Sequence, residues 1–122
     1  MPDPRDFRSP ESWYAVLYHE LGHSCAHRTR LDRMKGDTAW AKFGSPGYAL
    51  EELTAELTSG YLCAECQIFD VLEENAVAYC QSWIRVLKND KTLFVRAAGK
   101  AQHSADYIVN RAEQQAQLAV AA

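Results

Sequence analysis

A pair of histidines with a glutamate between them is the part of the sequence best suited to chemistry. The segment Tyr18–His23 reads Tyr-His-Glu-Leu-Gly-His, so His19 and His23 are four residues apart and Glu20 follows the first. On an α-helix, residues four apart share one face, which brings both imidazoles to one point. Two neutral imidazoles can bind Zn²⁺ at roughly 2.0–2.1 Å, and the carboxylate can accept a proton from a bound water. The pattern predicts a zinc site with Glu20 as its base; the alternative is a pair of surface histidines.

A zinc site of this kind needs a third protein ligand, and a second segment offers two carboxylates. Glu52 and Glu56 lie one helical turn apart in a stretch predicted as a helix from about Tyr48 to Gln67. One of them can bind the metal while the other orients a ligating histidine. The alternative is that both lie at the solvent margin of the helix.

Length and composition limit the domain that can hold such a site. The 122 residues, of which 48 % are hydrophobic and 24 % charged, fit one ordinary soluble domain. A net charge of −3 argues against a generally cationic nucleic-acid binder. No apolar run approaches the roughly 20 residues of a membrane span, and the first residues lack the apolar core of a signal peptide. We therefore expect a cytoplasmic protein without a membrane partner; its oligomeric state is not indicated.

Four helices and no strand are predicted from apolar periodicity and from helix start and stop signals. The first runs from Pro10 to Arg28, with Ser9 as its N-cap. The others run from about Tyr48 to Gln67, Glu74 to Lys88 and Lys91 to Gln114. The elements predict a mainly α protein, a compact bundle of about four helices.

Prolines near the start and a change of composition near the end set the expected limits of the domain. Prolines before Ser9 favour an extended N-terminal arm over residues 1–9, and the Gln- and Ala-rich stretch 115–122 is predicted to fray. Residues 10–114 form the predicted domain. Within it, Gly22 would let another backbone approach closely. The alanines of the last helix imply close packing, with Phe94 expected on the same inward face.

Two further features allow more than one interpretation. The four cations Arg28, Arg30, Arg33 and Lys35 form either a solvated helix end or a contact to a phosphate backbone or an acidic substrate. Cys63 and Cys66 invite a redox or metal-binding interpretation, but no second Cys pair and no βαβ pattern accompany them. A reduced, structural thiol pair is the simpler interpretation in a cytosolic chain.

The two candidate segments together resemble a known class of enzymes. His-Glu-Leu-Gly-His followed by Glu-x-x-Ala-Glu at Glu52–Glu56 looks like the gluzincin metallopeptidases. In these enzymes the first acid of the second motif is the metal ligand, and the acid four residues on supports the site. The resemblance implies Glu52 as the ligand and Glu56 as its support.

The order of further segments resembles the C-terminal zincin domain of ArdC-like antirestriction proteins, which also occurs in polyvalent proteins of phages and plasmids. These segments include Phe7–Glu11 and Ser82–Lys91, and the resemblance covers roughly Pro4 to Val109. It implies a zincin-like core, which we expect this chain to form with little or no sheet, and a role in protecting mobile DNA from host restriction. It also implies an upstream domain for single-stranded DNA.

The beginning of the chain departs from this family pattern. Only 18 residues precede His19, too few for the sheet whose edge strand aligns a peptide in zincins. We therefore expect a truncated product or a fragment, which would contact DNA only through the missing upstream domain.

Zinc-assisted hydrolysis of a peptide or protein substrate is the expected function. His19, His23 and Glu52 would hold Zn²⁺, and Glu20 would accept the proton of its water. The alternative is a zinc-stabilised interaction module for protein or DNA that is catalytically weak or inactive. Glu20 favours the enzyme, because a structural site would not need it, whereas the missing strand favours the module.

Peptide hydrolysis also needs a donor for the developing oxyanion. Tyr48, Tyr61 or His27 could serve, and the sequence does not choose among them. His27 lies one further turn along the face of His19 and His23. It then either lines the cleft or is a plain surface histidine.

Overall fold

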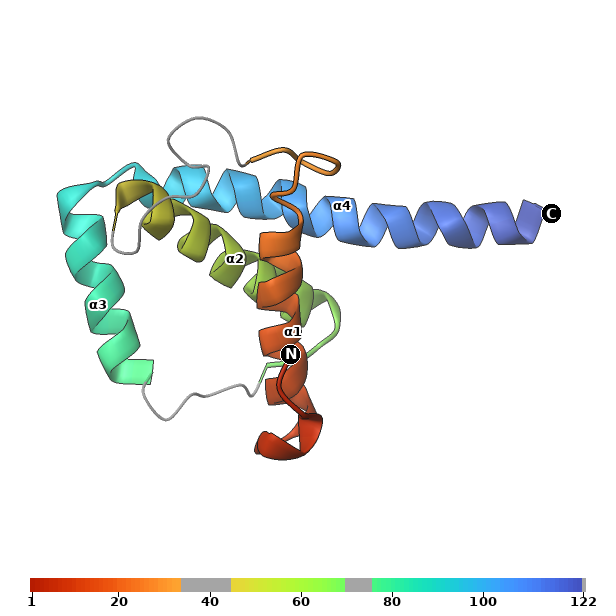
Figure 1. Cartoon of the computed structure of the whole chain (residues 1–122), viewed down its shortest axis with the longest axis horizontal. Helices are drawn as coiled ribbons and strands as arrows, with labels where there is room; N and C mark the ends of the chain where they lie inside the picture. Colours follow the sequence, from red (N-terminus) through yellow and green to blue (C-terminus); the bar gives the residue numbers. More distant parts are fainter. Residues whose placement is uncertain (34–44, 70–75, 122) are drawn as a thin grey trace.

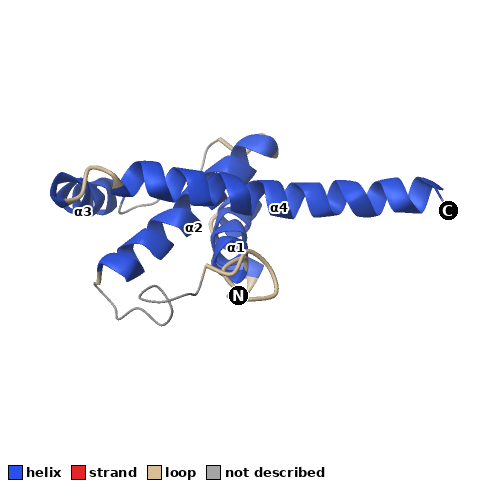
Figure 2. Cartoon of the chain, turned by 90° about the horizontal axis from the view of Figure 1, so that it is seen from above, coloured by secondary structure: helices blue, strands red, loops and turns tan. Residues whose placement is uncertain are grey.

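Four α-helices make up most of the described protein. The computed structural model describes residues 1–33, 45–69 and 76–121. The helices are α1 (Pro10–Ser24), α2 (Pro46–Glu65), α3 (Ala76–Asn89) and α4 (Leu93–Ala121), preceded by one 3-10 turn, η1 (Pro4–Asp6). Over these residues Figure 2 shows helices and loops without a strand, which confirms the predicted mainly α bundle.

The central helix of the arrangement is α2, and both α1 and α4 pack against it (Figure 1). The C-terminal part of α4 projects beyond the other helices. This helix continues to Ala121, past the predicted end at Gln114, so residues 115–121 are helical. Glutamine and alanine are good helix formers, which accounts for the continuation. Across the described residues, no helix combines the length and apolar character needed to cross a membrane.

Both α1 and α2 begin with a Ser-Pro pair. Ser9 Oγ accepts a hydrogen bond from the Ser12 N–H, and Ser45 Oγ accepts one from the Tyr48 N–H, each at 3.2 Å. A proline follows each cap at the first helical turn. These serines satisfy N–H groups that have no partner inside the helix. The predicted cap at Ser9 is confirmed, whereas α2 begins at Pro46 rather than at Tyr48.

The helix α1 ends at Ser24 rather than at the predicted Arg28, because the chain folds back on the helix end. The Leu31 N–H donates to the Cys25 carbonyl at 2.9 Å. Asp32 adopts a left-handed φ of 52°, a conformation that aspartate tolerates better than most residues. The segment after α1 is therefore a tight turn that returns toward α2.

The cations after α1 have two different environments. Arg28 and Arg30 are exposed, as expected of a solvated helix end. The side chain of Arg33 is only 7 % exposed and pairs with Glu51 of α2, so the solvated interpretation is wrong for this residue. Lys35 lies outside the described residues.

The thiols match the structural interpretation better than the redox one. Cys25, Cys63 and Cys66 are free. Burial raises the pKa of Cys63, which disfavours a reactive thiolate. Cys66 is exposed, and its Sγ lies 3.3 Å from the Tyr18 hydroxyl.

The contacts of α2 with its neighbours combine a leucine cluster, Leu50, Leu53 and Leu93, with small buried side chains. The largest fully buried side chains are Thr54, Thr58, Cys25 and Ser104. The buried alanines of α4 are Ala97, Ala101 and Ala105. At the start of α4, Leu93 is buried and Phe94 is 48 % exposed, so the inward position predicted for Phe94 is wrong. Leu93 is four residues before Ala97 and shares its buried face.

Gly22 is the point of closest approach between α1 and α2. A Cβ at this position would lie 3.1 Å from Ala55 Cα and 3.1 Å from Thr58 Cβ. Because helix backbone and a β-branched carbon cannot move aside easily, we expect Gly22→Ala to lower the free energy of unfolding by about 1–3 kcal/mol. Urea denaturation of the metal-free protein measures this change.

The matched control for this substitution is Gly60→Ala in α2. No atom lies within 4 Å of a Cβ built at Gly60. Replacing a helical glycine without a clash should stabilise the protein by about 0.5–1 kcal/mol. Similar effects of the two substitutions would show that the helices do not require the close approach at Gly22.

Candidate metal centre

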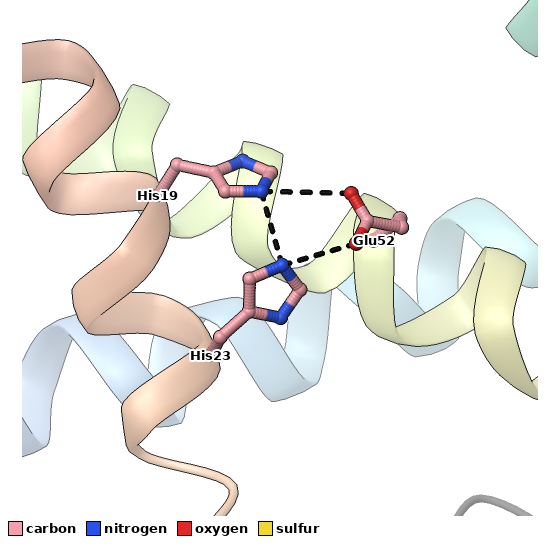
Figure 3. A group of neighbouring side chains, drawn as sticks. All are labelled: His19, His23 and Glu52. Carbon is pink, nitrogen blue, oxygen red and sulfur yellow. Dashed lines mark hydrogen bonds and ion pairs between the residues drawn. The ribbon is translucent and has the colours of Figure 1, made fainter. Parts of the chain in front are cut away.

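The helix α1 presents two imidazoles to α2. His19 and His23 share one face of α1, and their Nε2 atoms are 3.0 Å apart. Glu52 of α2 faces both rings (Figure 3). Its Oε1 is 3.1 Å from His23 Nε2, and its Oε2 is 3.5 Å from His19 Nε2. The structure thus brings together the three residues predicted as ligands.

The three side chains suit a divalent metal ion. One ligand atom from each lies within 4.8 Å of the others. Two imidazole nitrogens and one carboxylate oxygen form the donor set of catalytic zinc sites, which leave a further position for water. The side chains are 17 %, 27 % and 28 % exposed, in the order His19, His23 and Glu52, so solvent can reach the site.

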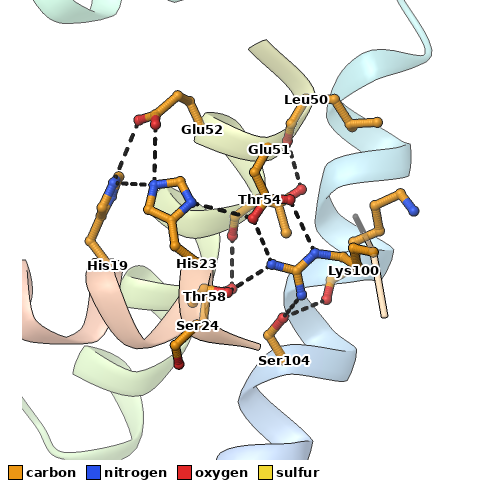
Figure 4. Close-up of polar contacts among 12 residues, drawn as sticks. His19, His23, Ser24, Leu50, Glu51, Glu52, Thr54, Thr58, Lys100 and Ser104 are labelled. Carbon is orange, nitrogen blue, oxygen red and sulfur yellow. Dashed lines mark hydrogen bonds and ion pairs between the residues drawn. The ribbon is translucent and has the colours of Figure 1, made fainter. Parts of the chain in front are cut away.

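Each histidine has a second carboxylate at its other ring nitrogen. Glu56 Oε1 lies 2.8 Å from His19 Nδ1, although the two groups are not aligned as in a regular hydrogen bond. Glu51 Oε1 lies 3.3 Å from His23 Nδ1 (Figure 4). A carboxylate at Nδ1 favours the tautomer whose Nε2 is free to bind a metal. Glu56 therefore lies beside His19, and its supporting role stays a prediction.

The electrostatics of the metal-free site follow from these pairs. The Glu56 carboxylate raises the pKa of His19, against the effect of burial, and the charges of Glu52 and Glu20 act in the same direction. Burial alone would raise the pKa of Glu51. Its hydrogen bonds with His23 and Arg33 outweigh burial, so that its pKa is lowered and it remains a carboxylate.

Of the other predicted residues, Glu20 and Tyr48 lie beside the metal ligands. Glu20 is exposed on α1, next to His19, and its charge contributes to the pKa of that histidine. Tyr48 precedes Glu52 by one turn of α2. Burial and the neighbouring Glu52 carboxylate raise the pKa of Tyr48.

The remaining two candidates lie elsewhere. Because α1 ends at Ser24, helical spacing does not carry His27 to the face of the ligands. It is exposed in the following turn, and its Nδ1 is 2.8 Å from Thr29 Oγ1. Tyr61 lines a hollow between α2 and α4 together with residues such as Asp106, and no metal ligand lines that hollow.

Sequence reasoning missed two residues of the site. The sequence prediction assigns no role to Glu51, and it places Arg33 in the cationic patch after the first helix. The signal available for Glu51 is that it adjoins Glu52, the predicted ligand, on a helix with an apolar stripe. The inward turn that buries Arg33 gives no comparable signal in the sequence.

The positions of Glu52 and Glu56 predict different losses on substitution. Glu52 contacts the metal-facing nitrogen of both histidines, whereas Glu56 contacts His19 on the opposite side of its ring. We expect Glu52→Ala to remove most of the metal affinity and Glu56→Ala to weaken it about 10–100-fold. A competitive chelator titration measures both. A greater loss for Glu56→Ala would reverse the assignment.

A helical pair of histidines, a carboxylate from the next helix and a glutamate beside them form a zincin-type arrangement. In agreement, a family model described as a zincin-like metallopeptidase matches residues 1–100 of the chain. The protein belongs to this family. Family membership and the donor set together indicate a site for a divalent metal.

The relatives of the chain are longer proteins. The uncharacterized protein y4eC of Sinorhizobium fredii is 38 % identical over 109 residues, which are 88 % of this chain and 34 % of y4eC. A DNA primase TraC of Escherichia coli is 41 % identical over 117 residues, which are 96 % of this chain and 11 % of the primase. The chain therefore spans about a third of y4eC and about a tenth of the primase.

A solved structure is also similar. It is the Mn(II)-bound crystal structure of the antirestriction protein ArdC from plasmid R388. ArdC shares 40 % sequence identity with this chain, and the two structures superpose with a TM-score of 0.67. The similarity covers 90 % of this chain and 39 % of ArdC. The resemblance to the zincin domain of ArdC-like proteins is thereby confirmed.

Proposed function

We propose that the chain is a zinc-dependent peptidase domain that cleaves peptide bonds with an activated water. The observation that carries the proposal is that the donor set has three members among the described residues, with an exposed carboxylate, Glu20, next to it. Structural zinc sites have four protein ligands, whereas catalytic sites have three and an open position. The donor set of two imidazoles and one carboxylate favours zinc as the ion.

Each residue of the site has a role in this reaction. A bound zinc ion would supply a water of lowered pKa and would polarise the substrate carbonyl. Glu20 takes the proton of the attacking water on its carboxylate and returns it to the leaving amine. Glu51 and Glu56 hold the rings of His23 and His19 so that both Nε2 atoms face Glu52.

The oxyanion donor that we assign is Tyr48. Its hydroxyl is near Glu52, whereas His27 is in an exposed turn and Tyr61 lines a different hollow. A phenol with a raised pKa keeps its proton at neutral pH and can donate a hydrogen bond to a developing negative charge.

For Tyr48→Phe we expect kcat for peptide cleavage to fall by about 10²–10³-fold, the usual loss of one oxyanion donor. KM and metal affinity should change little, because the ring remains. Steady-state kinetics and a chelator titration measure the two effects. An unchanged kcat would exclude Tyr48 as the donor.

The biological setting that we propose is an antirestriction protein of a plasmid or phage. Its support is the similarity to ArdC from plasmid R388 over 90 % of this chain. In this setting the substrate is a protein or peptide, and any contact with DNA belongs to a part of the protein outside this domain. The proposed compartment is the cytoplasm, where incoming DNA meets restriction enzymes.

The proposal is tested by incubating the chain with unfolded proteins and with native restriction proteins. The expected result is new fragments with added Zn²⁺ and none after removal of the metal with a chelator. Binding of a protein or DNA without cleavage would instead identify a metal-stabilised interaction module. The absence of a strand from the described residues favours this alternative, because zincins align peptides on an edge strand.

A further inference from the structure

Arg33 connects three helices at a buried position behind the metal centre. Its guanidinium donates to both carboxylate oxygens of Glu51 in α2, at 3.2 and 2.9 Å. It also donates to the Gly22 carbonyl in α1 at 2.7 Å and to Ser104 Oγ in α4 at 2.7 Å. A guanidinium that is 7 % exposed needs such acceptors, since water cannot replace them.

The contact between Arg33 and Gly22 also completes the end of α1. Gly22 lies in the last turn of that helix, where carbonyls lack an intrahelical N–H partner. Because Gly22 has no side chain, its backbone lies against α2, and its carbonyl is within reach of Arg33. The cation also suits the negative end of the helix dipole.

Glu51 links the guanidinium to the metal centre. Its Oε1 is 2.9 Å from Arg33 and 3.3 Å from His23 Nδ1, so one oxygen serves both partners. The fork of Arg33 fixes the carboxylate plane, and the carboxylate in turn fixes the His23 ring. Glu56, the carboxylate beside His19, is 39 % exposed. The His19–Glu56 pair is therefore more open to solvent than the His23–Glu51 pair.

We infer that Arg33 is a positioning residue for the metal centre, which holds Glu51 against His23 and ties this pair to α4 through Ser104. The position of α4 on the α1–α2 pair thereby contributes to metal affinity. The inference rests on the metal centre and not on the proposed hydrolysis. It is therefore tested by Zn²⁺ binding without a substrate, and failure to find a protein substrate would leave it unaffected.

The test is a double-mutant cycle on Zn²⁺ affinity, measured by chelator competition. Lysine keeps the charge of Arg33 but not its fork, so Arg33→Lys should weaken affinity about 10-fold, and Glu51→Gln about 10–100-fold. Because both act through His23, the double variant should lose no more than Glu51→Gln alone. Glu56→Gln acts on His19 instead. In a variant that carries both Arg33→Lys and Glu56→Gln, the factor by which Zn²⁺ affinity falls should therefore be the product of the two single factors.

Two controls distinguish positioning from simple support of the fold. Arg30→Lys changes a neighbouring exposed arginine that donates to the Ser24 carbonyl, and it should leave Zn²⁺ affinity unchanged. Circular dichroism of each metal-free variant shows whether it is folded. The inference would be overturned by a folded Arg33→Lys protein whose Zn²⁺ affinity is unchanged. It would also be overturned if the affinity losses of Arg33→Lys and Glu51→Gln multiplied in the double variant.

A second variant serves if Arg33→Lys does not fold. Ser104→Ala removes one acceptor of the guanidinium and leaves Arg33 and Glu51 in place. It should weaken Zn²⁺ affinity in the otherwise unchanged protein and have no further effect in the Glu51→Gln background. Equal losses in both backgrounds, or no loss in either, would contradict the inference.

Discussion

Glu20→Gln is expected to lower kcat for peptide cleavage by about 10²–10⁴-fold, the range for loss of a general base. The amide is nearly the same size as the carboxylate but cannot accept the proton of the attacking water. Because Glu20 is exposed and is not one of the three grouped ligands, metal affinity should remain unchanged. Cleavage rate and Zn²⁺ affinity should be measured on the same preparation.

Glu11→Gln is the matched control, since Glu11 is an exposed glutamate in the first turn of the same helix. It should cleave at the rate of the unmodified protein. Should Glu20→Gln retain full cleavage, its carboxylate is not the base. A loss of metal in that variant would instead indicate that Glu20 supports the ion.

His19→Ala and His23→Ala are each expected to abolish stoichiometric metal binding. Either change leaves two of the three grouped ligands, and the remaining imidazole also loses its neighbour on the metal-facing side. Loss of metal should remove cleavage as well, because no activated water remains. Metal analysis of purified protein by mass spectrometry gives the ratio of metal to chain.

His103→Ala tests whether any histidine loss has this effect. His103 is exposed on α4 and should leave the metal content near one ion per chain. Stoichiometric metal in a variant that lacks both His19 and His23 would show that the ion binds elsewhere. The same samples allow zinc and manganese to be distinguished.

The local parts of the site were predictable from sequence because they depend on helix periodicity. The spacing of His19 and His23 fixes their common face, and Ser9 with Pro10 fixes where that helix begins. Gly22 similarly indicated a close approach, which the structure shows at Ala55. The choice of Glu52 over Glu56 depended on family resemblance, and the structure places Glu52 at the metal-facing nitrogens.

The parts that were not predictable depend on how the chain returns after a helix. The end of α1 at Ser24 and the left-handed Asp32 bring Arg33 inward, and periodicity contains no information about such a turn. Continuing the helix to Arg28 placed His27 on the wrong face. The predicted start of α2 at Tyr48 was wrong for a different reason. Ser45 and Pro46 form the same helix-start signal as Ser9 and Pro10, so this start could have been predicted from the sequence.

The small side chains between the helices have a consequence for how the protein responds to metal supply. Where α1 meets α2, Gly22 lies against Ala55 and Thr58, and such small residues bury little apolar area. His19 and His23 of α1 and Glu52 of α2 would hold a bound ion together, so the ion would join the two helices. By mass action, each tenfold rise in free metal above Kd adds about 1.4 kcal/mol to the stability of the folded state. Metal scarcity in a cell would thus shorten the lifetime of this domain and also remove the activity proposed for it.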